Sequence, residues 1–184
     1  MARDVKFSVS RPKADRVYHV NEDDVRVVLS RLPLDVCQRL RAVHFNDRSW
    51  GARTLGYVNR GRREIGLCAL PPRMSLARFL FRGESSPQEF GAARGRQWPA
   101  LAIRRLLLYD VFLHELGHLQ VTNEVAKAER RKFAMEKCAR EFALHWRRLL
   151  WSKPFSHPDP VHNPPSLEEL DTLGTEQDNT GVGG

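Results

Sequence analysis

The feature that most constrains this chain is an apolar stretch over residues 98–120 that carries two histidines and a glutamate close to its end. A Trp-Pro pair opens it, which is typical of a helix start, and Leu, Ile, Val and Phe dominate the rest of the stretch. Asp110, His114, Glu115 and His118 make the stretch too polar to cross a membrane. Burying such side chains costs free energy unless something binds them. The sequence therefore predicts a helix whose polar end holds a ligand.

The spacing of the two histidines indicates a shared metal ion. His114 and His118 are four residues apart, so on a helix they lie on one face with Cβ atoms about 6 Å apart. Their nitrogens can then meet at one tetrahedral zinc ion, at Zn–N distances of about 2.0–2.1 Å. Glu115 lies about 100° around the helix, where it could take a proton from a water molecule that the metal acidifies. The competing interpretation is two buried, hydrogen-bonded histidines beside a surface glutamate.

The residues around this pair resemble the active-site helix of the zincin metallopeptidases. That pattern has Val or Thr three residues before the first histidine, uncharged residues between the pair, and an apolar residue after the second. The chain matches it at Val111, Leu113, Leu116, Gly117 and Leu119 and departs from it at Gln120. The resemblance covers residues 40–143 loosely. It implies an α+β fold in which a small mixed sheet of about three or more strands packs on the metal helix and a following C-terminal helix.

The resemblance also implies where a third ligand lies. The metzincin position six residues after His118 holds Glu124 instead of His, and the Gly-His-Gly segment of SprT-like proteases is missing. Residues 136–143, Glu-Lys-Cys-Ala-Arg-Glu-Phe-Ala, resemble a segment of the ImmA/IrrE-type metallopeptidases in which the leading Glu is the ligand. The chain thus resembles a gluzincin with Glu136 as third ligand. Arg140 stands where thermolysin-like enzymes carry Asp, which argues against that subgroup.

The helical pattern of residues 124–151 supports Glu136 and leaves one rival. Apolar residues form a stripe at helical spacing: Val125, Phe133, Ala139, Ala143, Trp146 and Leu150. Glu136 lies within this stripe, where a carboxylate needs a partner, either the metal or a nearby arginine. Glu129 is about 20° off the same line and is the rival ligand. If residues 118–153 formed one continuous helix, Glu136 would lie about 27 Å beyond His118, so a shared metal requires a reversal near residues 121–123.

The rest of the chain predicts a small α+β domain. Alternating apolar residues indicate three strands, at residues 42–45, 54–58 and 64–68, the last two joined as a hairpin. Helical spacing is found at residues 22–32, 34–40 and 75–81, the first capped by Asn21. Residues 1–20 show little periodicity, and residues 71–97 form a long connection. We expect one domain over residues 1–153 and a Pro/His-rich segment with an acidic disordered tail over residues 154–184.

The charge balance bears on partners. The formal net charge is +8 at pH 7, and residues 166–184 hold five acidic residues without Lys or Arg, so the first 165 residues carry +13. Such a body could bind nucleic acid or an acidic partner. Five arginines in loops could contact phosphates or stay solvated: Arg60, Arg62, Arg63, Arg94 and Arg96. Three widely spaced cysteines and the lack of an apolar N-terminal segment predict a cytoplasmic protein.

Other residues could assist the chemistry. Four side chains could donate a hydrogen bond to an oxyanion: Tyr109, His145, His157 and His162. Asp110 could orient an imidazole or balance local charge. The strand near residues 65–69 could pair with an extended substrate.

The expected function is hydrolysis of peptide bonds in a protein or peptide substrate, with zinc on His114, His118 and Glu136 and with Glu115 as general base. Two alternatives stay open. The first is a regulatory protein that keeps the zincin core and binds a partner or nucleic acid without essential peptidase activity. The second is a metal-free helical protein.

Overall fold

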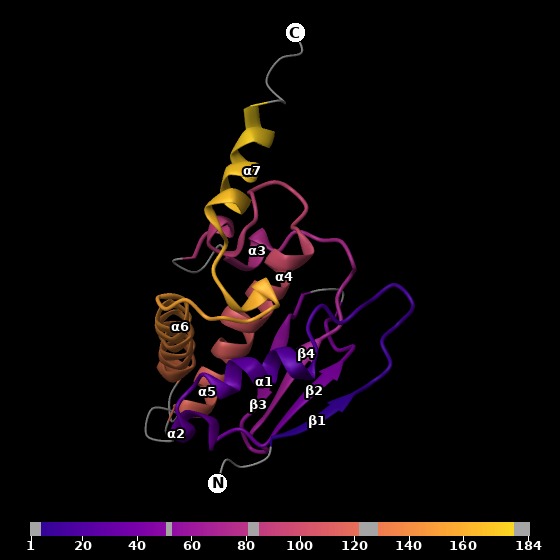
Figure 1. Ribbon diagram of the computed structural model, residues 1–184. Coiled ribbons are helices and arrows are strands. Elements are labelled where there is room, and N and C mark those ends of the chain that lie inside the picture. The colour runs from indigo at the N-terminus through magenta and orange to yellow at the C-terminus, as the bar shows by residue number, and fades with distance from the viewer. Residues whose placement is uncertain (1–4, 51–52, 81–84, 122–128, 179–184) are drawn as a thin grey trace.

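The computed structural model describes residues 5–50, 53–80, 85–121 and 129–178, with the backbone alone for residues 129–132 and 174–178. It shows a mixed α+β fold around an open four-stranded sheet (Figure 1). The strands are β1 (Lys6–Val9), β2 (Ala42–Asn46), β3 (Gly56–Asn59) and β4 (Glu64–Cys68). The helices are α1 (Glu22–Ser30), α2 (Leu34–Cys37), α3 (Ala77–Leu80), α4 (Ala100–Leu106), α5 (Leu113–Gln120), α6 (Glu129–Trp151) and α7 (Leu167–Asp178). The predicted α+β class is confirmed.

The sheet has the order β1-β2-β4-β3, with β1, β2 and β4 parallel and β3 antiparallel to β4. The predicted hairpin is confirmed as β3 and β4, joined by a turn at residues 60–63. The prediction of an irregular start is wrong for β1, because residues 6–9 form a strand that pairs in parallel with β2. β4 lies between β2 and β3, so the prediction that this strand pairs with a substrate is also wrong: its backbone groups are already used.

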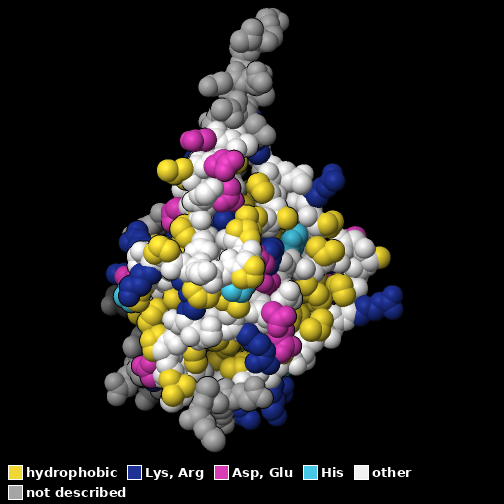
Figure 2. All heavy atoms as spheres, viewed as in Figure 1, with side chains coloured by type: hydrophobic (Ala, Val, Ile, Leu, Met, Phe, Trp, Pro, Cys, Tyr) yellow, Lys and Arg dark blue, Asp and Glu magenta, His cyan; other side chains and the backbone are white. Residues whose placement is uncertain are grey.

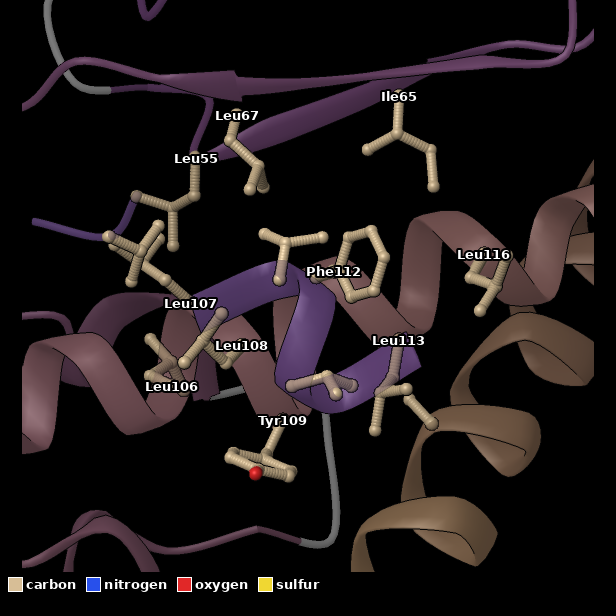
Figure 3. Packing of buried hydrophobic residues seen from close by; sticks show 14 of the residues in the cluster. Leu55, Ile65, Leu67, Leu106, Leu107, Leu108, Tyr109, Phe112, Leu113 and Leu116 are labelled. Atoms are coloured by element: carbon tan, nitrogen blue, oxygen red, sulfur yellow. The ribbon is translucent and has the colours of Figure 1, made fainter. Parts of the chain in front are cut away.

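One face of the sheet carries the hydrophobic core. Ile65 and Leu67 of β4 project toward Phe112 and Leu116, as Figure 3 shows, and all four side chains are buried. Each such side chain contributes about 1.5–3 kcal/mol by leaving water. The core therefore fixes α5 and the segment before it against the centre of the sheet.

The predicted apolar helix over residues 98–120 is confirmed as three consecutive helical segments. Pro99 caps α4, a π-helical segment spans Leu107–Phe112, and α5 follows directly. A π-helical turn is wider than an α-helical one, so it changes the direction in which the following side chains point. Such segments occur often at functional sites, and this one ends two residues before His114.

The C-terminal part differs from the predicted disordered tail. Residues 167–178 form α7, which projects from the body and carries clustered Asp and Glu side chains (Figures 1 and 2). Buried Arg105 holds its start, because its two terminal nitrogens lie 3.0 and 3.1 Å from the carboxylate oxygens of Glu169. Arg104 likewise binds Asp159 and Asp24 at 2.6 and 2.9 Å. These long-range ion pairs leave no periodic signal in the sequence. Residues 179–184 lie outside the described part.

A second buried arginine, Arg147, ties α6 to the segments behind the metal helix. Its side chain is 1% exposed, and its guanidinium donates to Asp110 at 2.7 Å, Glu89 at 2.8 Å and Ser85 at 2.7 Å. The same guanidinium lies over the Phe90 ring at 4.8 Å. Asp110 therefore forms an ion pair with Arg147. Of the two roles that the sequence left open for Asp110, orienting an imidazole or balancing local charge, the structure favours the second.

Replacing Arg147 with Met should destabilise the fold by about 3 kcal/mol, because Asp110 and Glu89 would lose their partner while still half-buried. For a chain of this size, the thermal midpoint should fall by about 6–12 °C. Arg148→Met is the matched control, since Arg148 is exposed and should change stability by less than about 0.5 kcal/mol. Calorimetry of both metal-free variants checks this, and equal midpoints would show that the buried ion pairs contribute nothing.

Within the described residues, no helix combines the length and the apolar character that a membrane crossing requires.

Candidate metal centre

Three side chains from α5 and α6 converge on one point. The Nε2 atoms of His114 and His118 are 3.1 Å apart, and the carboxylate oxygens of Glu136 lie 3.3 and 3.4 Å from them. The ligand atoms of all three residues lie within 4.8 Å of one another, so the group could hold one metal ion. The two imidazole rings are nearly perpendicular, with an interplanar angle of 86°. The convergence that the sequence predicted for His114, His118 and Glu136 is confirmed, while the identity of the ion is not.

The helices can meet here because the chain reverses after α5. Val121 leaves the helix with φ −71° and ψ 123°, and α6, which is described from Glu129, packs against α5. The alternative of one uninterrupted helix is therefore wrong. Residues 122–128 include the predicted start of the second helix and part of the predicted reversal, and they lie outside the described part. So does the side chain of Glu129, whose rival role stays a prediction.

Gly117 sets the distance between the two helices. A Cβ atom at this position would lie 3.0 Å from both Cα and O of Ala139 and 3.1 Å from Cβ of Phe142. Ala139 is completely buried and stands three residues after Glu136, so both face α5. The missing side chain of Gly117 thus lets α6 approach closely enough for the Glu136 carboxylate to reach the histidines.

Gly117→Ala should push α6 away and weaken metal binding. The added methyl group would meet backbone atoms, which cannot rotate aside, and such overpacking costs about 1–3 kcal/mol. The higher helix propensity of Ala offsets about 1 kcal/mol of this destabilisation. We expect a loss of about 1 kcal/mol in stability and about tenfold in zinc affinity. Gly61→Ala is the control, since nothing nearer than 3.7 Å meets its Cβ. Calorimetry and zinc competition measure both effects; an unchanged affinity would mean that the helix spacing does not matter.

Burial sets the charge state of the two histidines. It lowers the pKa of His114 to about 4, with the neighbouring His118 adding to the effect, and it lowers the pKa of His118 as well. Both rings are therefore neutral near pH 7. A neutral imidazole has the free lone pair that a metal ion needs.

Glu115 stands beside the three converging side chains without joining them. It lines the same cleft, and burial, with a smaller contribution from the charge of Glu136, raises its pKa to about 8. A carboxyl group with such a pKa exchanges protons near neutral pH. Glu115 therefore lies beside the group that could hold a metal ion and outside that group. Its role as general base stays a prediction.

The group opens into a cleft of about 1290 Å³ between β3, α5 and α6. Gly56, Tyr57 and Val58 line one wall, and Phe133 and Arg140 line another. Phe133 is 72% exposed, so its predicted place in the buried stripe is wrong. Arg140 lies one helical turn after Glu136, and its positive charge helps to lower the pKa of His114. From the sequence alone, Arg140 served only as evidence against the thermolysin-like subgroup. Its spacing of four residues from Glu136 was the signal that could have identified it.

The four predicted oxyanion donors do not line the cleft. The Tyr109 hydroxyl and His162 Nδ1 lie 3.0 Å apart in the core, and Figure 3 shows Tyr109 pointing away from the sheet. His157 contacts the same group edge-on, with its ring centroid 4.5 Å from that of His162 and an interplanar angle of 87°. His145 is exposed on α6. Tertiary packing therefore removes all four from the site.

Comparison of the chain with family models, with curated proteins and with solved structures gave no match. The interpretation of the site accordingly rests on its geometry and on the chemistry of its side chains. Both favour a bound metal next to a carboxyl group that can exchange a proton.

Proposed function

We propose that this protein is a zinc-dependent metallopeptidase of the gluzincin type that hydrolyses peptide bonds in a protein or peptide substrate. One observation carries the proposal: the convergence of His114, His118 and Glu136. Ligand atoms about 2.0–2.1 Å from one tetrahedral ion are about 3.3 Å apart. The two imidazole nitrogens are 3.1 Å apart, and each lies 3.3 or 3.4 Å from a different oxygen of Glu136. With one ligand atom taken from each residue, the three atoms lie within 4.8 Å of one another, close enough to share one ion.

The donor set fits zinc. Two neutral imidazoles and one carboxylate form the ligand set of many catalytic zinc sites, in which a fourth position stays open. Zinc in this site would supply a Lewis acid that polarises a peptide carbonyl and lowers the pKa of water toward about 7. The side chains of all three ligands line the cleft, so a substrate that enters it can reach the centre.

Glu115 supplies the proton transfer. Its carboxylate oxygens accept a proton from the attacking water and then donate it to the nitrogen of the leaving amine. The pKa of about 8 belongs to the metal-free site; a nearby dication lowers it and leaves the group as the base. The cationic Arg140 is the candidate to stabilise negative charge on the carbonyl oxygen, since it lines the cleft one turn from Glu136.

The edge of the sheet can hold the substrate. β3 pairs with β4 on one side, and its residues line the cleft beside α5. Its other edge can accept an extended peptide through backbone hydrogen bonds. Gly56 keeps this strand close to the metal helix, because a Cβ there would lie 2.8 Å from Val111 Cγ1. A sheet edge beside the metal helix is also what the zincin resemblance implies.

Metal analysis combined with peptide cleavage tests the proposal. Protein purified without chelators should contain about one zinc ion per chain and should cleave peptides in a proteome-derived library, with products identified by mass spectrometry. Removal of zinc by a chelator should abolish cleavage, and addition of zinc should restore it. A zinc-loaded protein that cleaves nothing would favour the regulatory alternative, and a protein without affinity for zinc would favour the metal-free one.

A further inference from the structure

Three arginines surround a second hollow next to the metal cleft. It has a volume of about 510 Å³ and is lined by Arg39, Arg60, Gly61, Arg63, Leu119 and Val121. Arg39 follows α2, whereas Arg60 and Arg63 belong to the turn between β3 and β4. Arg60 lines the metal cleft as well, so the two hollows adjoin.

The end of α5 holds two of these arginines in place. Arg39 Nη1 donates to the carbonyl oxygens of Leu119 and Gln120 at 3.4 and 3.2 Å, and Arg60 Nη2 donates to that of Val121 at 2.9 Å. These carbonyls carry the partial negative charge of a helix C-terminus, which orients a guanidinium without neutralising it. Each guanidinium has five N–H donors, so several remain available to a ligand.

Arg63 occupies a backbone conformation that is unfavourable for arginine. Its φ of 59° lies in the left-handed region, where Gly or Asn is usual. The Arg63 N–H donates to the Arg60 carbonyl at 3.2 Å, and its own carbonyl accepts from Arg41 at 2.8 Å, so the turn is fixed. The turn thus places an arginine side chain at a backbone position whose positive φ favours Gly or Asn.

Within the described residues, the hollow has no counter-charge of its own. Its lining includes no acidic residue, and no carboxylate of the described part forms an ion pair with Arg39, Arg60 or Arg63. Three guanidinium groups around one small hollow repel one another unless an anion binds between them. The missing component is therefore an anionic group.

We propose that this hollow binds an acidic side chain of the peptide substrate and makes the enzyme select Asp or Glu near the cleaved bond. This inference rests on the proposed peptidase function. Val121 is three residues after His118, about 4.5 Å along the helix axis, and an extended peptide advances about 3.3 Å per residue. An acidic residue about one or two positions from the cleaved bond falls at the hollow.

A peptide carrying one acid fits this surface better than a nucleic acid does. The adjoining cleft has mixed charge, because Asp110, Glu115, Glu136 and Glu141 line it together with four basic residues: Arg53, Arg60, Lys137 and Arg140. A peptide places a single negative charge in the hollow and neutral backbone along this cleft, whereas a nucleic acid would place a negative charge at every nucleotide beside the acidic side chains.

Cleavage of a proteome-derived peptide library by the zinc-loaded protein tests the selection. The wild type should show Asp or Glu enriched about tenfold at one position, one or two residues from the cleaved bond. Arg39→Gln and Arg63→Gln should each lose most of that enrichment. Arg62→Gln is the matched control, because Arg62 belongs to the same turn but does not line the hollow, and it should keep the enrichment. Cleavage by the wild type without acidic enrichment would overturn the inference and leave the peptidase function intact.

A binding measurement separates the two proposals if no peptide is cleaved. Fluorescein-labelled tetraglutamate should bind the zinc-loaded Glu115→Gln variant about tenfold more tightly than labelled tetraglutamine, and Arg63→Gln in that background should remove the difference. Equal affinities for the two peptides would refute the subsite, and so would a labelled single-stranded oligonucleotide that bound more tightly than tetraglutamate through the same arginines. Arg63 makes no side-chain hydrogen bond that is described, so its loss should leave the thermal midpoint unchanged.

Discussion

Replacing Glu115 with Gln should lower kcat for peptide hydrolysis by about 10²- to 10⁴-fold, the usual contribution of a general base. The amide keeps the size of the side chain and cannot accept the proton at neutral pH. Zinc content should be unchanged, because the Glu115 carboxylate is not among the three groups that converge on the metal position. Cleavage rates and zinc content, measured on the same preparation, test the expected loss of kcat and the expected unchanged zinc binding.

Glu64→Gln is the control for this variant. Glu64 is half-buried like Glu115, but it belongs to β4 and lies 3.5 Å from His44 Nε2, away from the cleft. Its replacement should leave both zinc content and kcat close to the wild-type values. Full activity of Glu115→Gln would show that another group carries the proton, whereas loss of zinc together with activity would place Glu115 among the ligands.

The metal centre could be predicted from the sequence because its geometry is mostly local. His114, Glu115 and His118 lie within one and a half turns of a helix, so their relative positions follow from helix geometry alone. The position of Glu136 does not follow from helix geometry alone, because the same sequence also allowed a single long helix. Its place in an apolar stripe indicated a buried partner, and the partner proved to be the histidine pair.

The rest of the site could not be predicted because it depends on contacts between distant segments. The oxyanion candidates were predicted from residue type alone, but Tyr109 and His162 are buried in the core and bonded to each other, away from the cleft. β1 has only four residues, too few for their alternation of polar and apolar side chains to identify a strand, and it becomes one by pairing with β2. The place of β4 inside the sheet follows from its parallel pairing with β2, which no local pattern reveals.

Gly117 has a physical role that the sequence pattern did not reveal, because the zincin resemblance required only an uncharged residue at this position. Gly117 determines how closely α6 approaches, and therefore whether Glu136, the proposed third ligand, can reach His114 and His118. Its neighbour across the interface, Ala139, was part of the predicted apolar stripe. The pair shows that the ligand set depends on packing between α5 and α6 as much as on the three ligands themselves.

Replacing Glu136 with Ala should weaken zinc binding by about 10²-fold or more, since loss of a partner that merely supports a ligand already costs about 10- to 100-fold. Competition against a chromophoric chelator measures this affinity. Zinc that binds the folded state raises its thermal midpoint in proportion to RT ln(1 + [L]/Kd). The wild type should therefore gain stability when zinc is added, and the variant should gain little at the same concentration.

Two matched variants on the same helix decide which carboxylate is the ligand. Glu141→Ala removes an exposed carboxylate 3.7 Å from Lys137 and should leave the zinc affinity unchanged. Glu129→Ala removes the rival that helical phase allowed, and it too should bind zinc like the wild type if Glu136 is the ligand. Normal affinity in Glu136→Ala with loss in Glu129→Ala would transfer the role to Glu129. The metal-free midpoints of all three variants distinguish a lost ligand from a damaged fold, because only a damaged fold lowers the midpoint before zinc is added.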